Sequence, residues 1–297
     1  MDQIHDSNAF EEAVIGTRSA TTACVAVAGM HRSGTSLVAS VLGDAGVDLG
    51  RGFLAANSHN QRGYFEDRRF VDLHDAMLGA NGTDWALTGC TKRLHVPDHL
   101  RRSALELVSE REEETRRAAS EAGAVCSAQT RAWGWKDPRT TLFLDFWLEL
   151  LPSLSVVVPF RDAASVVASL RRRRDLPLQH RFHGAWPLRK LGLPMTRDRV
   201  AIQLWETYNN HALWCAERYP GRVAFVDGTR TQSDLPLVLR WLRDVRGVSL
   251  SGQASNQRLE PALLSVRPPL DLRLRTTARA TVAVTMRSLR AASGAGA

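Results

Sequence analysis

Long hydrophobic runs are absent from this sequence of 297 residues. No run approaches the roughly 20 apolar residues that a helix needs to cross a bilayer, so we expect no membrane partner. The first residues, MDQIHDSNAFEEAV, carry acidic side chains and no apolar core follows a basic start, which excludes a secretion signal. We therefore expect a cytoplasmic protein.

Cysteine is also scarce. The four cysteines, Cys24, Cys90, Cys126 and Cys215, form no C-x-x-C pair and have no histidine at metal-ligand spacing. This pattern argues against structural zinc and against a disulfide framework, and it indicates reduced, mostly buried thiols. No D-x-D or H-E-x-x-H pattern points to another metal site, so we expect no metal.

Lysine is nearly missing. Three of the 39 basic residues are lysines (Lys92, Lys136 and Lys190), the other 36 are arginines, and the net charge is +8. A GC-rich genome, which favours arginine codons, explains most of this bias; binding of a nucleotide, a nucleic acid or an acidic acceptor is the functional alternative. Basic residues are not interleaved with aromatic ones as in nucleic-acid-binding proteins, so we expect no nucleic-acid partner.

Strand-like and helix-like segments alternate along the chain. Strands are predicted at 23–29, 131–136, 154–160 and 222–227, and helices at 35–46, 68–80, 97–122, 162–174, 197–219 and 234–246, with a further helix that Pro138 opens. The helix at 97–122 is highly charged, and we expect a solvated face. Strands separated by helices favour a central parallel sheet covered on both faces, a three-layer α/β/α fold.

The expected domain organisation is simple. An N-terminal extension (1–22) precedes a single α/β domain (23–250), in which 175–196 is an inserted loop or lid. A C-terminal segment (251–297) lacks the β/α rhythm, and its end, SGAGA, is expected to be frayed.

The stretch VAVAGMHRSGTSLVAS, residues 25–40, has the form of a phosphate-binding loop without its lysine. Gly29 and Gly34 keep the glycine spacing of G-x-x-x-x-G-K-[ST], but Thr35 occupies the lysine position and Ser36 follows. Backbone N–H groups at the start of a helix can hold an anion, with Arg32 as the cation. A triphosphate would be poorly neutralised here. A turn that binds nothing is the alternative.

A second candidate anion site lies in VVVPFRDAASVVASLRRRRDL. Arg161 ends a strand, and Ser165, Ser169 and Arg173 recur every four residues, on one face of a helix. Arginine and hydroxyl groups at a strand end can bind a phosphate. Alternatively, the serines bond to carbonyl groups of their own helix.

These segments together resemble a known family. GMHRSGTSL is similar to the 5′-phosphosulfate loop of sulfotransferases that use 3′-phosphoadenosine 5′-phosphosulfate (PAPS), and Arg161 with Ser169 and Arg173 resembles their 3′-phosphate motif. GWKDPRTTLFLDFWLELLPSLSVVVPFRD resembles the K-D-P segment of the tyrosylprotein type and of related bacterial enzymes, a group that includes carbohydrate sulfotransferases. The resemblance covers 25–46 and 131–174, and loosely 200–246.

The resemblance implies a P-loop-containing, sulfotransferase-like fold, PAPS as co-substrate, no metal, and a hydroxyl acceptor on a small molecule or glycan. The implied nucleotide-binding residues are Gly29, His31, Arg32, Ser33, Gly34, Thr35, Ser36, Arg161, Ser169 and Arg173. Trp133, Trp135, Trp205 and Tyr208 are interpreted as core residues.

Catalysis would need cations at the departing phosphate and a general base for the acceptor hydroxyl. Arg32 and Lys136 are the candidate cations, although Lys136 can instead form a salt bridge to Asp137, which is expected to cap the next helix or to orient Lys136. The segment NSHNQRGYFEDRR lies where the family commonly places the base.

Glu66 is the first candidate base and His59 the second, with Asn57 and Asn60 as orienting or acceptor-binding groups. Alternatively, Glu66 begins a helix and pairs with Arg68 or Arg69.

Two other functions stay open at this point. One is a P-loop phosphotransferase, and the other is a non-catalytic nucleotide-binding protein. The sequence indicates neither the acceptor nor the oligomeric state.

Overall fold

A computed structural model of the chain describes residues 23–51, 65–90, 92–121, 132–171, 197–250 and 276–295. The expected lid at 175–196, the candidate residues Asn57, His59 and Asn60, and Arg173 lie outside the described residues.

The described strands form one parallel sheet in the order β2-β1-β3-β4. Their bounds are β1 (Cys24–Val27), β2 (Trp133–Lys136), β3 (Leu154–Phe160) and β4 (Val223–Asp227). Because both faces of such a sheet are covered, its strands read as continuous apolar runs, as LSVVVPF does in β3. Parallel pairing also brings all four carboxyl ends to one edge of the sheet.

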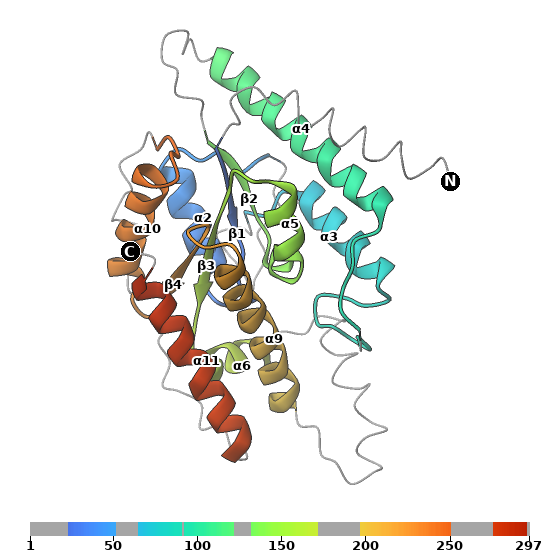
Figure 1. Cartoon of the computed structure of the whole chain (residues 1–297), viewed down its shortest axis with the longest axis vertical. Coiled ribbons are helices and arrows are strands. Elements are labelled where there is room, and N and C mark those ends of the chain that lie inside the picture. The colour runs from blue at the N-terminus through green and yellow to red at the C-terminus, as the bar shows by residue number, and fades with distance from the viewer. Residues whose placement is uncertain are drawn as a thin grey trace.

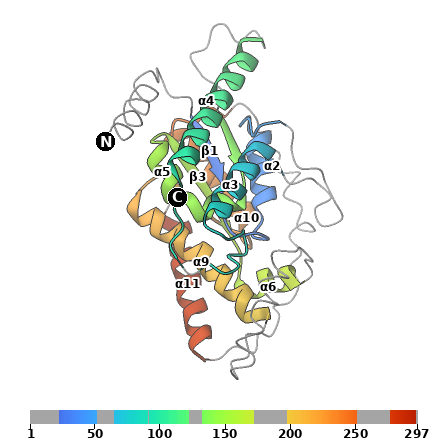
Figure 2. The same cartoon turned by 90° about the vertical axis from the view of Figure 1, so that its right-hand side faces the viewer.

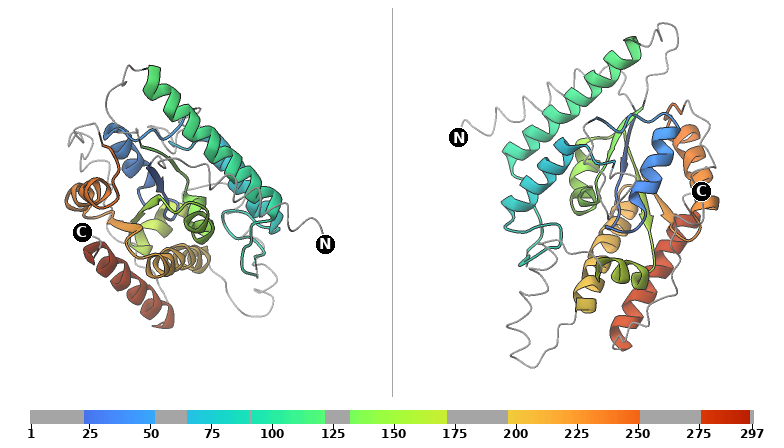
Figure 3. Two further views of the ribbon diagram at one scale, coloured as in Figure 1. Left: turned by 45° about the horizontal axis from the view of Figure 1, so that its top comes forward. Right: turned by 180° about the vertical axis from the view of Figure 1, so that it is seen from behind.

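Helices cover both faces of the sheet. Their bounds are α2 (Thr35–Asp44), α3 (Arg68–Ala80), α4 (Asp98–Glu121), the 3-10 helix η1 (Pro138–Phe143), α5 (Leu144–Leu150), α6 (Ala163–Arg171), α9 (Arg197–Arg218), α10 (Thr231–Asp244) and α11 (Thr276–Ala295). Val25 and Val27 of β1 pack in one hydrophobic cluster with α2 and α10, whereas Cys24 and Ala26 pack in the other, with residues of α3 to α6, α9 and α11. Figure 3 shows α2 and α10 together in front of the sheet in its right-hand view, and Figure 1 shows the helices of the other face.

The expected three-layer α/β/α fold with a parallel sheet is confirmed, and most element bounds agree to within three residues. The segment after Pro138 differs in detail, because it begins as the 3-10 helix η1 before α5 follows. The sequence pattern indicated no particular helix or strand within 251–297. Helix α11 forms there beside α9 (Figure 1), and the Thr285 hydroxyl donates to Asn210 Oδ1 at 3.1 Å.

Helix α4 has the expected solvated face, and its other side buries two polar residues. Glu110 is exposed, but Arg111 and Thr115, four residues apart, are buried. They face the end of the β1–α2 unit, and α3 packs beside α4 (Figure 2). None of the helices in the described ranges is long and apolar enough to cross a membrane.

Candidate active site

The strand order defines where a ligand would bind. From β1 the chain passes to β2, which lies beside β1 in the sheet. It then continues to β3, which lies on the opposite side of β1. In open α/β sheets, ligands bind outside the carboxyl ends of the strands at such a reversal, here between β1 and β3. The loop that contains Arg32 follows β1, Lys136 ends β2, and Arg161 follows β3, so these three candidates share the predicted edge.

The loop after β1 depends on its two glycines. Gly29 has a φ of 105°, and a Cβ atom there would lie 2.6 Å from the carbonyl oxygen of Pro159 in β3. Its N–H donates a 2.6 Å hydrogen bond to Thr141 Oγ1 within η1. Gly34 has a φ of 98° and precedes α2, but a Cβ atom at this position would meet open space. Gly29 therefore fixes the loop against the sheet, whereas Gly34 leaves room beside the helix start.

Three polar residues between these glycines have distinct surroundings. Arg32 adopts a left-handed φ of 70°, a strained conformation that proteins tend to keep at functional sites. The Ser33 hydroxyl is fully buried and has no hydrogen-bond partner within the described ranges. The His31 ring is buried against Trp85 at 4.4 Å and near Tyr208 at 6.1 Å between ring centroids. An orphaned hydroxyl inside such a loop is suited to a ligand oxygen.

The two anion motifs of the sequence meet in space. Arg32 Nε donates a 2.7 Å hydrogen bond to Ser169 Oγ of α6, so the Ser169 hydroxyl accepts from the loop after β1. Asp162 accepts the Ser165 N–H at 2.8 Å and thereby holds the start of α6.

Arg161, at the end of β3, is positioned from two sides. Its carbonyl accepts Trp205 Nε1–H of α9 at 2.9 Å. Its side chain lies against Gly228, where a Cβ atom would come within 2.5 Å of Arg161 Cγ. A glycine after β4 is therefore what allows the Arg161 side chain to lie there.

Lys136 and Glu66 form a buried ion pair. Lys136 Nζ lies 2.5 Å from Glu66 Oε1, and both residues are buried. Lys136 thus contacts Glu66 rather than the alternative partner Asp137. Arg68 instead pairs with Asp72, and Arg69 pairs with Asp67 and Glu114, so neither alternative partner contacts Glu66.

The surroundings of Glu66 change its acidity. Burial raises the pKa of Glu66, and the positive charge of Lys136 opposes this rise. A carboxylate with a raised pKa is a stronger proton acceptor than an exposed one, which suits a general base.

Asp137 organises the end of β2. It caps η1, as the sequence predicts, by accepting the Arg139 N–H at 2.9 Å. His74 Nδ1 lies 2.9 Å from Asp137 Oδ2, and Trp147 Nε1–H donates to His74 Nε2 at 2.9 Å. Since Nε2 accepts this bond, His74 is the Nδ1–H tautomer and donates to Asp137. Asp137 is fully buried; although burial opposes ionisation, Arg139 and His74 hold its pKa well below the usual range.

Sequence reasoning missed three of these supporting residues. Thr141 accepts from the loop after β1, His74 holds Asp137, and Arg139 pairs with Asp75 at 2.8 Å as well as with Asp137. The K-D-P motif could have indicated both Arg139, which follows it directly, and Thr141, which lies two residues further on. His74 stands alone in a helix, where its spacing gives no hint of a partner 63 residues away. Trp133, Trp135, Trp205 and Tyr208 are buried, as expected for core residues.

No protein-family model matches the chain, and no curated protein sequence matches it. The solved structures that are similar to it include two mycobacterial sulfotransferases. Sulfotransferase STF1 from Mycobacterium tuberculosis H37Rv matches at 13% identity over 97% of this chain and 81% of that one, with a TM-score of 0.48. Sulfotransferase STF9 from Mycobacterium avium matches at 15% identity over the same shares, 97% and 81%, with a TM-score of 0.42.

Proposed function

We propose that this protein is a sulfotransferase that moves a sulfuryl group from PAPS to a hydroxyl group of a small molecule or glycan. The observation that carries the proposal is the hydrogen bond from Arg32 Nε to Ser169 Oγ. It joins the loop after β1 to the helix after β3, so two anion-binding segments become neighbours. A nucleotide with phosphate groups at both the 5′ and 3′ positions of one ribose needs such a pair of adjacent sites.

The residues present fit this nucleotide. The 5′-phosphosulfate would be held by the N-terminus of α2, with Arg32 as the cation and Ser33, Thr35 and Ser36 as hydroxyl donors. The buried Ser33 hydroxyl lacks a protein partner among the described residues, as a group reserved for a ligand would. Arg161 and Ser169 would hold the 3′-phosphate. Arg173 would join them, and it lies outside the described residues.

PAPS supplies the sulfuryl group and a phosphate leaving group. Arg32 and Lys136 provide positive charge at the edge where negative charge would develop. Glu66 would accept the proton of the acceptor hydroxyl. Its contact with Lys136 brings the candidate base and a candidate cation together in one buried pair, and the positive charge of Lys136 opposes the rise in the pKa of Glu66 that burial causes.

Thermal unfolding with candidate nucleotides tests the proposal. Adenosine 3′,5′-bisphosphate should raise Tm without added metal, because a ligand that binds only the folded protein stabilises it by mass action. A rise with ATP–Mg²⁺ and none with the bisphosphate would contradict the proposal and indicate a phosphotransferase. The acceptor is then found by incubating candidate hydroxyl compounds with labelled PAPS, and duplex DNA serves as the control anion.

A further inference from the structure

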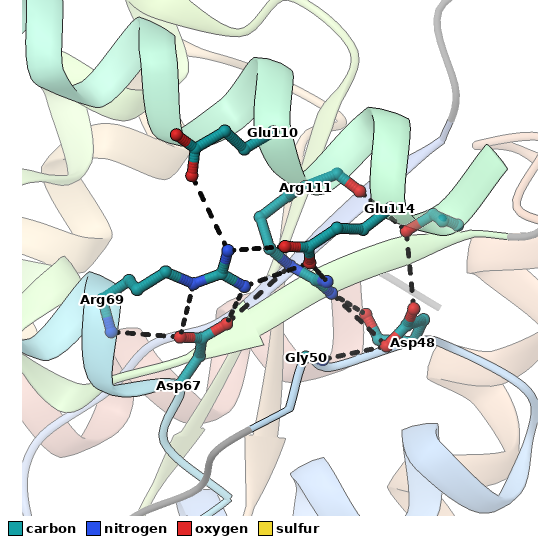
Figure 4. Close-up of polar contacts among 8 residues, drawn as sticks. Asp48, Gly50, Asp67, Arg69, Glu110, Arg111 and Glu114 are labelled. Carbon is teal, nitrogen blue, oxygen red and sulfur yellow. Dashed lines mark hydrogen bonds and ion pairs between the residues drawn. The ribbon is translucent and has the colours of Figure 1, made fainter. Parts of the chain in front are cut away.

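A buried guanidinium group, Arg111 of α4, links the two ends of the segment that leads to Glu66. The exposed fraction of Arg111 is 1%. Its Nη2 atom donates to the Asp48 carbonyl at 3.2 Å and lies 3.3 Å from Asp48 Oδ1, just before the segment. Its Nε atom lies 3.8 Å from Asp67 Oδ2, directly after Glu66. Figure 4 shows Arg111 between these two carboxylates.

The same two ends also touch each other. Gly50 has a φ of 101°, and its N–H donates to Asp48 Oδ1 at 3.0 Å. A Cβ atom on Gly50 would lie 2.5 Å from Asp67 Oδ2, so only a glycine permits this close approach. The residues directly before and directly after this segment therefore lie next to each other, and Arg111 contacts both sides.

Each end of the segment is tied to the sheet. Asp48 pairs with the start of β2, where its carbonyl accepts the Gly134 N–H at 2.8 Å. Glu66 contacts Lys136 at the end of the same strand. Arg111 also lies over the Trp133 ring of β2, with its Cζ atom 5.9 Å from the ring centroid. A shift of Arg111 would thus move the chain next to Glu66 relative to β2.

Arg111 supplies one of the two positive charges in a cluster that has more carboxylates than cations. Four carboxylates, those of Asp48, Asp67, Glu110 and Glu114, surround two guanidinium groups, Arg69 and Arg111. Arg69 contacts Asp67 but is not bonded to Asp48 within the described ranges. Loss of Arg111 would leave Asp48 and Asp67 facing each other without the cation that lies between them.

We propose that Arg111 is a positioning residue that clasps Asp48 and Asp67 and so holds Glu66 against Lys136. The part that concerns catalysis rests on the proposed function, whereas the clasp itself does not. Three nitrogen atoms of one planar group make the contacts: Nη2 to Asp48, Nε to Asp67 and Nη1 to Glu114, the last at 2.6 Å. A lysine side chain has one nitrogen and cannot contact all three carboxylates at once. A lysine at this position therefore distinguishes the clasp from simple neutralisation of charge.

Hydrogen exchange of the full-length protein tests the clasp directly. Arg111→Met keeps an apolar stem over Trp133 but removes the contacts. We expect exchange at 48–51 and 65–70 to accelerate by about tenfold or more, while β3 and β4 keep their protection. Arg111→Lys should give the same local acceleration. Arg116→Met, at an exposed position of the same helix, should leave exchange at 48–51 and 65–70 unchanged.

Activity and binding supply the second readout. In Arg111→Met, turnover should fall by roughly tenfold or more while affinity for adenosine 3′,5′-bisphosphate stays within about twofold of wild type. Restored protection in Arg111→Lys, or a uniform rise of exchange in Arg111→Met, would overturn the clasp. If Arg111→Met does not fold, Gly50→Ala tests the same contact by displacing Asp67, and unchanged exchange at 65–70 in that variant would also overturn it. Absence of bisphosphate binding in the wild type would refute the proposed function and leave the exchange result standing.

Discussion

Arg32 and Ser169 lie 137 positions apart in the sequence, and a hydrogen bond of 2.7 Å joins Arg32 Nε to Ser169 Oγ. The bond crosses the reversal point of the sheet between β1 and β3. Each residue was identified from its own segment, one from a glycine-spaced loop and one from a helix after a strand. Their contact joins the two candidate anion sites. A substitution of either residue should therefore change the contribution of the other residue to ligand affinity.

A double-mutant cycle measures this coupling. Arg32→Ala and Ser169→Ala should each weaken binding of adenosine 3′,5′-bisphosphate by about 1.5–3 kcal/mol, the usual loss for a charge-assisted contact. Because the two side chains touch, the losses should not add, with an interaction energy of about 0.5 kcal/mol or more by calorimetric titration. Ser165→Ala, one turn earlier in α6, should change affinity by less than about 0.5 kcal/mol. Strictly additive losses would mean that the two residues act at separate sites.

Arg161→Ala separates the two phosphate positions. Arg161 would contact the 3′-phosphate, so this variant should lose affinity for the bisphosphate far more than for adenosine 5′-phosphosulfate, which has no 3′-phosphate. The expected loss for the bisphosphate is about 1.5–3 kcal/mol. Equal losses for both ligands would indicate that Arg161 supports the fold through its packing against Gly228.

Much of the fold was predictable because the hydrophobic pattern of a segment matches the way that segment packs in the folded protein. β3 is a continuous apolar run, and the residues of α3 that face the core recur at helical spacing, so both were assigned with correct bounds. Helix α11 was not predicted, since TTARATVAVTMRSLRAASGA has small and polar residues on most of its surface and buries few large apolar groups. Its position depends on contacts with α9, which no local pattern encodes.

In the candidate site, the sequence indicated individual residues but not the contacts between them. Arg32 and Ser169 were proposed from the spacing within their segments, whereas Lys136 and Glu66 were proposed because their segments resemble those of PAPS-dependent sulfotransferases. Their pairing was not predicted: Lys136 was a candidate cation with Asp137 as its alternative partner, and Glu66 was the candidate base with a neighbour in α3 as its alternative partner. Sequence spacing indicates which face or edge a side chain occupies, whereas partners 70 and 137 positions apart are set by the order of the strands.

Glu66→Gln tests the general base. The substitution keeps size and shape but removes the basic group, so nucleotide affinity should stay near the wild-type value while turnover falls by roughly 10²–10⁴. A base works only when deprotonated, so wild-type turnover should rise with pH through the pKa of Glu66, which burial raises above its ordinary value of 4.5. That acidic limb of the pH–rate profile should disappear in Glu66→Gln.

The alternative base gives the opposite pattern. If His59→Ala abolishes turnover with intact nucleotide affinity while Glu66→Gln stays active, the assignment passes to His59. Normal turnover in both variants would show that neither residue takes the proton.

The two loop glycines should respond differently to the same substitution. Gly29→Ala places a methyl group 2.6 Å from a backbone oxygen of β3, which the sheet cannot move aside, and should cost about 3 kcal/mol or more in unfolding free energy. Gly34→Ala meets open space and should cost only the strain of its positive φ, about 1–2 kcal/mol. Urea unfolding of both variants gives the comparison. Equal costs would show that backbone strain, and not contact with Pro159, determines the need for glycine.

Acid should weaken the cluster around Arg111 in a defined pH range. Hydrogen bonds from Arg69, and to a smaller degree from Arg111, lower the pKa of Glu114 from 4.5 to about 2. A carboxylate with a depressed pKa stabilises the fold fully above its unfolded value, and this stabilisation is lost as pH falls from about 4.5 to about 2. Glu114 is half-exposed, so solvent screening limits its contribution to roughly 1 kcal/mol. Urea unfolding across this range should therefore show a steeper loss of stability in wild type than in Glu114→Gln, whereas Glu106→Gln, at an exposed position of α4, should follow the wild-type curve. Identical pH dependence in wild type and Glu114→Gln would show that Glu114 does not contribute to the loss of stability in acid.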